Sequence, residues 1–357
     1  MRGTEVKQEE MFSCVTLSER VPEKHPLGRV RRLTDEALVA LEPLFQSMYA
    51  EQGRPSIPPA QLLRALLLQM LYSVNSERML MEQMQYNLLY RWFVGLGMDE
   101  AVWDASTFSK NRERLLQADA ARQFFQAVLA QAKKEKLIHD EHFTVDGTLI
   151  EAWASEKSYQ PKPEHKPSGK PGGNSRARRK LLRETHASRT DPDARLYRKG
   201  MKSGLRLSHM AHAMSENANG LVVETAVSQC SPREERQQGL RMVERVRKWA
   251  RPRTVAADKG YHERDFVEGL RSMNVEAHVP AFKQGRRSLV DAALYKTARY
   301  VESQRRRKWI ERFFAWLKGT AGLRKTRHRG HRKLDWNFTL AATAYNLVRM
   351  TKLILAN

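Results

Sequence analysis

Three acidic residues occupy positions from which they could share a metal ion. Asp146 lies in a strand-like stretch before Gly147, and Asp258 ends the run VAAD. Glu311 lies in the helical stretch RRRKWIERFFAWLK. In open α/β sheets, residues that follow the carboxyl ends of strands lie at the rim where ligands bind. Hard divalent cations such as Mg²⁺ prefer carboxylate oxygens. The three residues therefore predict a catalytic metal site, if the fold brings them together.

Such a site would serve phosphoryl transfer. Three converging carboxylates can hold two Mg²⁺ ions, or Mn²⁺ in their place, about 3.5–4 Å apart; one ion activates the attacking water or 3′-hydroxyl and the other stabilises the leaving oxygen. Each acid also has a simpler interpretation. Asp146-Gly147 is a common turn signal, Asp258 is in a position typical of a helix cap, and Glu311 could be a surface ion-pair partner.

The setting of Glu311 favours the metal site. Residues 283–333 contain 17 Lys and Arg but only three Asp and Glu, and Glu311 is one of these three. At about 100° per residue, Arg307 lies about 40° and Lys318 about 20° from Glu311 around the helix. A separate face is apolar and comprises Trp309, Ile310, Phe313, Phe314 and Leu317. The carboxylate is thus expected between two cations that can hold DNA phosphates.

The net charge of +23 is concentrated in two segments. Residues 156–207 carry a net +10 and residues 283–333 a net +14, so the rest of the chain carries −1. Dense positive charge of this kind is typical of a polyanion partner, because each phosphate contact releases a condensed counterion. A basic, solvated surface is the alternative. The segment RKTRHRGHRK (324–333) supplies four further candidate DNA contacts: Arg324, Lys325, Arg327 and Arg329.

Other function classes have little support. No stretch approaches the roughly 18–20 apolar residues of a membrane span, and no nucleotide-binding glycine loop is present. Cys14 and Cys230 stand alone, which excludes a CxxC-type zinc site. His209 and His212 would face opposite sides of a strand, so they are not expected to share a metal. The start of the sequence does not resemble a signal peptide, and we expect a cytoplasmic location without a membrane partner.

The first third of the chain has helical periodicity. Helices are expected around residues 33–49, at 61–72 after the prolines Pro58 and Pro59, at 75–94, at 107–116 and at 120–136. Ser76 or Asn75 is expected to cap the third of these, and Gly95 or Gly97 to end it. We therefore predict an all-helical N-terminal domain over residues 1–138.

From His142 onward the pattern changes to alternating strands and helices. Strands are expected around residues 143–150 (with a turn or hairpin at Asp146-Gly147), 205–214, 221–227, 254–258 and 275–279, and helices at 232–250, 262–273, 305–318 and 336–355. Residues 156–204 are rich in Pro, Gly, Ser, Lys and Arg and are expected to form a basic, flexible insertion. Three early strands followed by alternating units predict an α/β domain over residues 139–357, with the mixed sheet of a ribonuclease-H-like core.

Several separated stretches resemble one family, the DDE transposases of bacterial insertion sequences, and within it the insertion sequence five group. They are SERMLMEQMQYNLLYRWFVGLG, DASTFSKNR, FTVDGTLIEAWAS, AADKGYHERDF, WIERFFAWLK and AGLRKTRHRG. The family has a Tyr–Arg–Glu–Lys signature, which Arg307, Glu311 and Lys318 match. Gln304 stands at the Tyr position, and Tyr300 lies one turn upstream.

The resemblance implies that Asp146, Asp258 and Glu311 are the catalytic, metal-binding triad. It further implies that the N-terminal helices bind terminal inverted repeats of double-stranded DNA, and that a metal-dependent cleavage is followed by strand transfer to target DNA. Two DNA ends imply a homodimer or higher assembly, acting at the nucleoid in a bacterial cytoplasm. A non-catalytic DNA-binding regulator and a general nuclease are the alternative functions.

Overall fold

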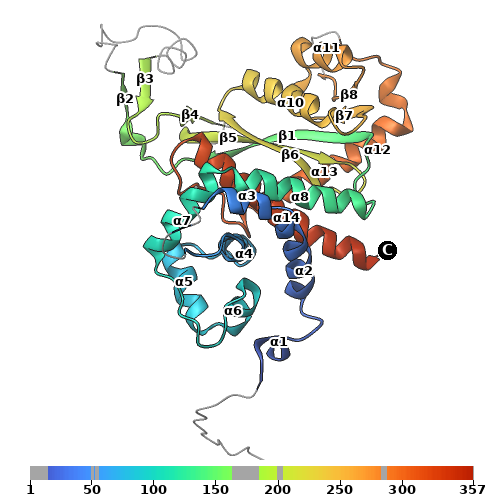
Figure 1. The fold of residues 1–357 in the computed structure, drawn as a ribbon. Helices are drawn as coiled ribbons and strands as arrows, with labels where there is room; N and C mark the ends of the chain where they lie inside the picture. The colour runs from blue at the N-terminus through green and yellow to red at the C-terminus, as the bar shows by residue number, and fades with distance from the viewer. Residues whose placement is uncertain are drawn as a thin grey trace, which may run out of the picture.

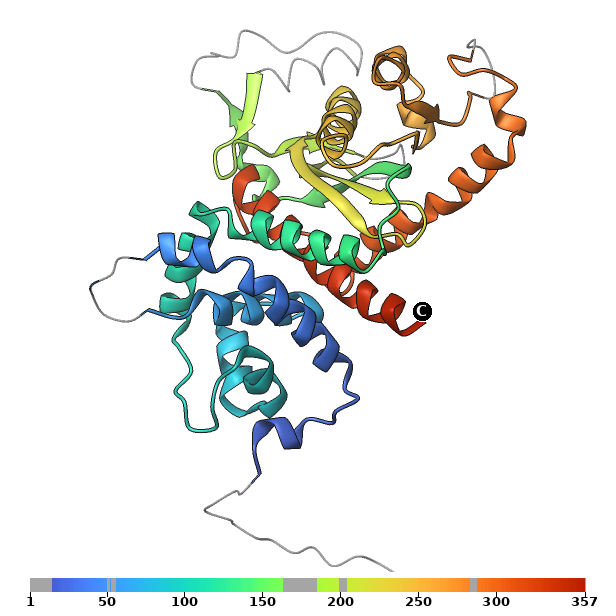
Figure 2. The same cartoon turned by 45° about the vertical axis from the view of Figure 1, so that its right-hand side comes forward.

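The structure is a computed structural model that describes residues 15–49, 52, 56–162, 185–198, 204–282 and 288–356. A mixed sheet has helices on both faces, and a long C-terminal helix lies between this sheet and the N-terminal helices (Figure 1). Turned by 45°, the N-terminal helices lie together below the sheet (Figure 2). In the described part of the chain, no helix is long and apolar enough to cross a membrane.

All secondary structure described before residue 142 is helical. The helices are α1 (Leu17–Arg20), α2 (Pro26–Val39), α3 (Glu42–Ser47), α4 (Pro59–Leu71), α5 (Glu77–Tyr86), α6 (Leu88–Val94), α7 (Ala105–Gln117) and α8 (Ala120–Lys134). Ser76 caps α5 by accepting the Met79 N–H. The single helix expected over 75–94 is divided at Asn87, because the Asn87 side chain accepts the Tyr90 N–H and starts α6.

The main sheet is built around β1 (His142–Glu151). One edge of β1 pairs antiparallel with β5 (Arg206–Glu216), which pairs antiparallel with β6 (Val222–Gln229). The other edge pairs parallel with β7 (Thr254–Ala256), which pairs parallel with β8 (Glu276–His278). The sheet is therefore mixed, as predicted, with antiparallel pairs among β1, β5 and β6 and parallel pairs among β1, β7 and β8.

The turn or hairpin predicted at Asp146-Gly147 is wrong. Both residues lie inside β1, opposite Ala213 and His212 of β5. A ladder of nine residue pairs with β5 outweighs the local turn preference of the Asp-Gly pair. Gly147 has a different role: a Cβ at this position would lie 2.5 Å from Glu235 Oε1, so the absent side chain makes room for Glu235 of α10 (Pro232–Val246).

Part of the expected flexible insertion is ordered. β2 (Tyr159–Pro161) pairs with β3 (His186–Ser188), and β4 (Arg195–Tyr197) adds to the edge of β5. Between β3 and β4, the fully buried carboxylate of Asp191 lies 3.0 Å from His209 Nε2. Residues 185–198 therefore belong to the folded structure, whereas residues 163–184 and 199–203 of the insertion lie outside the described residues.

Helices cover both faces of the sheet. α10 contacts β1, β5 and β6, and α11 (Arg264–Ser272) packs against α10 and β8. On the other face lie α12 (Ala298–Arg306), α13 (Lys308–Lys318) and α14 (His331–Ala356). Because α14 also contacts α2, α4 and α8, the apolar core runs continuously from the N-terminal helices to the sheet. A division into two domains at residue 138 stays a prediction.

His212 makes the stability of the sheet sensitive to acid. Its ring is fully buried in β5 with Nε2 2.7 Å from Ser228 Oγ, and burial lowers its pKa to about 3. Between pH 6.5 and this value the unfolded chain binds a proton that the folded chain does not, so His212 costs about 1.4 kcal/mol of stability per pH unit as the pH falls. We expect this loss of stability to be absent in His212→Gln. The measurement is the free energy of unfolding in urea at pH 7.0 and 5.0. The same slope in both proteins would contradict the assignment to His212.

Candidate active site

Asp146 lies in β1, and Asp258 lies two residues beyond the end of the neighbouring strand β7, where its side chain accepts the Gly260 N–H and caps a short 3₁₀ helix, Lys259–Tyr261. Thr144 of β1 is paired with Ala256 of β7 in parallel register, and each aspartate follows its paired residue by two positions. Since side chains alternate with a period of two and neighbouring strands are about 4.8 Å apart, the two carboxylates start from adjacent positions on the same face. Asp146 is 9% exposed and Asp258 is half-buried. Asp146 lies inside β1 rather than near its end, and the rim of the sheet forms here because β7 stops at Ala256.

Glu311 is joined to Asp146 through Arg307. Arg307 connects α12 to α13 in helical conformation, so its side chain stands one turn before Glu311. One guanidinium nitrogen lies 2.9 Å from Glu311 Oε1, and the other lies 3.9 Å from Asp146 Oδ2. The structure therefore brings the first and third acids to one cation, and the second acid follows the end of the neighbouring strand.

Packing of the apolar face of α13 fixes the position of Glu311. Ile310, Phe313 and Leu317 are completely buried, and the Phe313 ring meets Phe338 and Tyr345 of α14. Trp309, which was expected on the same face, is half-buried. Its ring contacts the guanidinium groups of Arg312 and Arg349, and its Cβ lies against Gly220 in the turn before β6.

The donor set suits a hard divalent cation, but the acids are not yet arranged as ligands. Among the residues described, no three His, Cys, Asp or Glu side chains lie close enough to hold a metal ion. The positive charge between Asp146 and Glu311 is instead that of Arg307. Carboxylate oxygens are the preferred ligands of Mg²⁺ and Mn²⁺, so the residue types fit such an ion although their present arrangement does not.

Two groups that the sequence did not predict adjoin the acids. The Tyr261 hydroxyl is buried and has no hydrogen-bond partner among the described residues. Burial raises the pKa of Tyr261 well above its ordinary value, and the negative charges of Glu235, Asp146 and Asp258 raise it further. Glu235 packs over Gly147 from α10. Glu235 carries no sequence signal, because only the fold brings α10 to β1.

The signature tyrosine has no equivalent at the surface of the site. The Gln304 side-chain amide donates to the His278 carbonyl. Tyr300, one turn upstream, is 9% exposed, and its ring packs against His278 and Tyr295. Burial raises the pKa of Tyr300 to about 12. Both side chains therefore take part in packing α12 against β8 and its surroundings.

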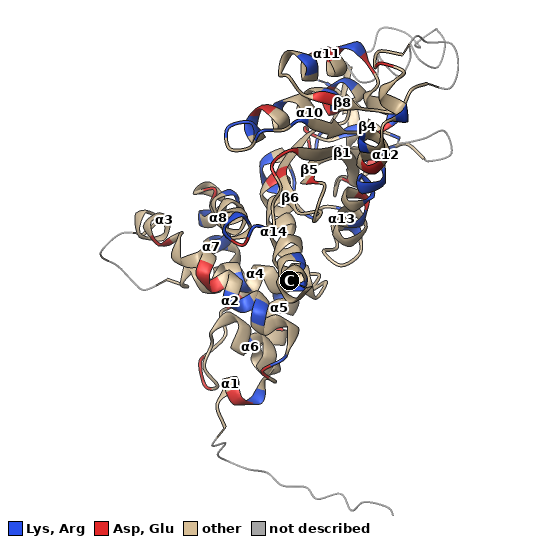
Figure 3. Cartoon of the chain, turned by 90° about the vertical axis from the view of Figure 1, so that its right-hand side faces the viewer, with Lys and Arg blue, Asp and Glu red and all other residues tan. Residues whose placement is uncertain are grey.

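Basic side chains surround the acids. Figure 3 shows Lys and Arg gathered along α12 and α13, and Lys318 is half-buried at the end of α13. The following loop pairs with the end of β1: Glu151 N–H donates to Arg324 O, and Thr326 N–H donates to Glu151 O. Leu323 and Thr326 are buried while the four candidate cations are exposed, namely Arg324, Lys325, Arg327 and Arg329.

The histidines of this region are structural neighbours of the insertion. His209 and His331 rings meet edge to face with centroids 5.1 Å apart, and the His331 backbone N–H donates to Asp193. His212 faces the other side of β5 and bonds Ser228. His209 and His212 therefore face opposite sides of β5, and the side chains of Asp191 and Asp193 connect residues 185–198 to β5 and to the start of α14.

Comparison with known proteins identifies two matching sequence families. Residues 15–114 match the family described as "Transposase domain (DUF772)", and residues 138–347 match the family described as "Transposase DDE domain". No curated protein sequence matches.

Solved structures were found with low overall similarity. A piggyBac transposase synaptic complex with hairpin DNA has a TM-score of 0.37 at 9% identity, over 90% of this chain and 74% of that one. The Mos1 strand transfer complex has a TM-score of 0.21 at 11% identity, over 83% and 81%. A Mos1 mariner paired end complex with Mn has a TM-score of 0.21 at 14% identity, over 90% and 94%.

The match to the DDE domain spans more than half of the chain, and it includes Asp146, Asp258 and Glu311. The chain therefore belongs to the Transposase DDE domain family.

Proposed function

We propose that this transposase binds the terminal inverted repeats of an insertion sequence and catalyses metal-dependent DNA cleavage and strand transfer. The observation that carries the proposal is the grouping of Asp146, Arg307 and Glu311, with Asp258 just beyond the end of the neighbouring strand β7. The strand order β6-β5-β1-β7-β8, antiparallel and then parallel, supports a ribonuclease-H-like core. The Arg307, Glu311 and Lys318 spacing supports membership of the insertion sequence five group.

Each residue of the site has a separate task. Asp146, Asp258 and Glu311 would hold Mg²⁺, or Mn²⁺ in its place, with two ions per site, and such ions supply Lewis-acid stabilisation of the reacting phosphoryl oxygens. Arg307, released from its carboxylate partners, and Lys318 would bind phosphate oxygens beside the scissile bond. Water or a DNA 3′-hydroxyl attacks in line, so no covalent protein intermediate is required.

The wider assembly follows from the need to hold two DNA ends. The N-terminal helices would recognise the inverted repeats, and the exposed cations Arg324, Lys325, Arg327 and Arg329 would hold the phosphate backbone. At least two copies of the chain would form the synaptic complex. We place this reaction at the nucleoid in the bacterial cytoplasm.

A DNA-binding regulator without catalysis is the second candidate. The observation that favours it is the ion pair of Arg307 with both Asp146 and Glu311, because the guanidinium cation already neutralises two of the three acids. Such a protein would bind the same DNA ends but leave them intact.

Cleavage of element ends by the purified chain tests the proposal. The substrate is a duplex that carries the inverted repeat bracketing the gene, and the control duplex has a shuffled repeat. We expect strand cleavage at the end of the repeat in Mg²⁺ and none in EDTA. Cleavage of both duplexes alike would indicate a general nuclease, and tight binding without cleavage in Mg²⁺ and Mn²⁺ would indicate the regulator.

A further inference from the structure

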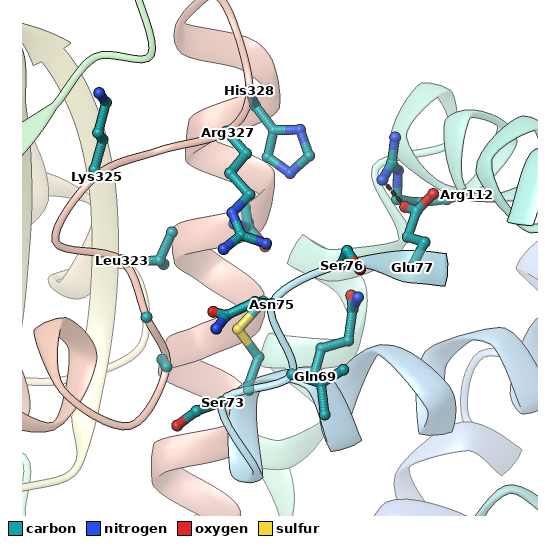
Figure 4. Close-up of a pocket in the computed structure, with 15 residues that line it drawn as sticks. Gln69, Ser73, Asn75, Ser76, Glu77, Arg112, Leu323, Lys325, Arg327 and His328 are labelled. Carbon is teal, nitrogen blue, oxygen red and sulfur yellow. Dashed lines mark hydrogen bonds and ion pairs between the residues drawn. The ribbon is translucent and has the colours of Figure 1, made fainter. Parts of the chain in front are cut away.

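A polar pocket lies between the N-terminal helices and the loop that follows α13 (Figure 4). Its volume is about 340 Å³. One wall is the turn between α4 and α5 with Ser73, Asn75 and Ser76, and the opposite wall is the loop with Lys325 and Arg327. Segments far apart in the sequence thus form one site, outside the group of catalytic acids.

The two walls are held in place by specific contacts. Ser73, in left-handed conformation, donates its hydroxyl to Thr320 O at 2.6 Å and so ties the α4–α5 turn to the loop. The buried Leu323 donates its backbone N–H to Leu317 O at 3.0 Å, and Thr326 pairs with Glu151 of β1. The pocket is therefore formed before any ligand binds, which reduces the ordering cost of binding.

The charge of the pocket is positive. Its one acidic lining residue, Glu77, forms an ion pair with Arg112. Arg327 is exposed and, among the described residues, has no ion-pair partner; its guanidinium extends from the loop toward Asn75 and Ser76 (Figure 4). Lys325 lies 5.2 Å from the Trp153 ring. The Lys325 amine points away from Asn75 and Ser76 (Figure 4), so Arg327 is the cation that remains available to an anion in the pocket.

Of two groups that adjoin the pocket, His328 contributes no charge, whereas the start of α5 favours an anion. The pKa of His328 is lowered to about 4, first by burial and then by the positive charges of Arg112 and Lys333, so the imidazole is neutral. The ten-residue helix α5 begins at the pocket, and Ser76 satisfies only the N–H of Met79. The other N–H groups of its first turn have no partner within the helix and favour negative charge.

We propose that this pocket binds a backbone phosphate of the substrate DNA, with Arg327 as the charged contact and the α4–α5 turn as the opposing wall. The proposal rests on the proposed function. It adds that the N-terminal helices and the loop beside the active site contact the same DNA strand. It makes Asn75, Ser76 and the start of α5 part of the DNA interface.

A phosphate within a polymer fits the site better than a free phosphate ion. Exposed Arg324 and Arg329 continue the line of cations along the loop beyond the pocket. The loop pairs with β1 at Glu151, five residues or about 17 Å along the strand from Asp146. This length along β1 equals the rise of about five base pairs, so a longer duplex is long enough to extend from the carboxylates to the loop that lines the pocket.

Binding of a fluorescent 30-base-pair duplex of arbitrary sequence in EDTA tests the pocket, because phosphate contacts carry no sequence information and cleavage is absent. The full-length chain is compared with Arg327→Ala and with Asn75→Phe, which fills the pocket without changing charge. Arg247→Ala removes an exposed arginine at the end of α10 and measures the effect of net charge alone. We expect about 5–10-fold weaker binding for both pocket variants, a salt slope smaller by about one for Arg327→Ala, and a change below twofold for Arg247→Ala.

Two results would overturn the pocket. The first is wild-type affinity in Arg327→Ala and in the charge reversal Arg327→Glu; because Arg327 is exposed, both are expected to fold even if Asn75→Phe does not. The second is that millimolar inorganic phosphate raises the melting temperature of the parent but not of Arg327→Ala, while the two proteins bind the duplex with equal affinity. This result would assign the pocket to free phosphate. Either result would reject the pocket proposal only, because cleavage of the element ends is measured in a separate experiment. Conversely, a chain that binds through the pocket and never cleaves would reject the proposed function alone.

Discussion

Glu311→Gln is expected to abolish strand cleavage while DNA binding is retained. Glutamine keeps the size of the side chain but cannot supply an anionic oxygen, so the acid group loses one of its three carboxylates. Removal of one electrostatic group from a catalytic site costs about 10²–10³-fold in rate, and loss of a proposed metal ligand is expected to reach at least the upper value. The measurement is the single-turnover cleavage rate of an end-bearing duplex in Mg²⁺, with affinity measured separately in EDTA.

The fold should tolerate this change. The Glu311 side chain is 52% exposed, and its ion pair with Arg307 lies at the surface, where such pairs contribute about 0–1 kcal/mol. Glu302→Gln is the matched control, because Glu302 is an exposed acid on α12 that pairs with Arg305 and Arg306 rather than with the site. Equal cleavage rates for Glu311→Gln and the parent would remove Glu311 from the proposed triad.

The order of elements could be predicted because hydrophobic periodicity is local. Strand spacing indicated β1, β5, β6, β7 and β8, and a turn of 100° per residue placed Arg307 beside Glu311. Local signals failed where distant partners decide the structure. Asp146-Gly147 has the composition of a turn, but pairing with β5 keeps it in a strand. The division between α5 and α6 depends on a hydrogen bond of the Asn87 side chain, which competes with helix continuation.

The contacts that define the site could not be read from the sequence. The distance from Arg307 to Asp146 depends on how α13 packs on the sheet, and Glu235 reaches β1 only because residue 147 has no side chain. The pocket likewise depends on the hydrogen bond between Ser73 and Thr320, which are remote in sequence. Residue types predicted the acids and the cations, whereas tertiary packing determined which of them meet.

Gly220→Ala is expected to destabilise the fold and to displace the helix that carries Glu311. Gly220 has φ +70°, and a Cβ there would lie 2.9 Å from Trp309 Cβ and Cγ. The left-handed conformation costs a residue with a side chain about 1–2 kcal/mol, and overpacking adds about 1–3 kcal/mol. We therefore expect the free energy of unfolding to fall by about 2–5 kcal/mol, measured by urea denaturation.

The position of Trp309 in α13 makes this variant informative about function. Trp309 precedes Glu311 by two residues on α13, so relief of the clash must move α13 or distort its first turn, and cleavage should fall more than DNA affinity. Gly204→Ala is the control, because a Cβ there meets no atom within 4 Å. Gly220→Asn separates the two causes, since asparagine tolerates the left-handed region but keeps the clash with Trp309. A Gly220→Ala protein within about 0.5 kcal/mol of the parent, the range of neutral surface changes, would show that the turn at Gly220 does not hold α13 in place.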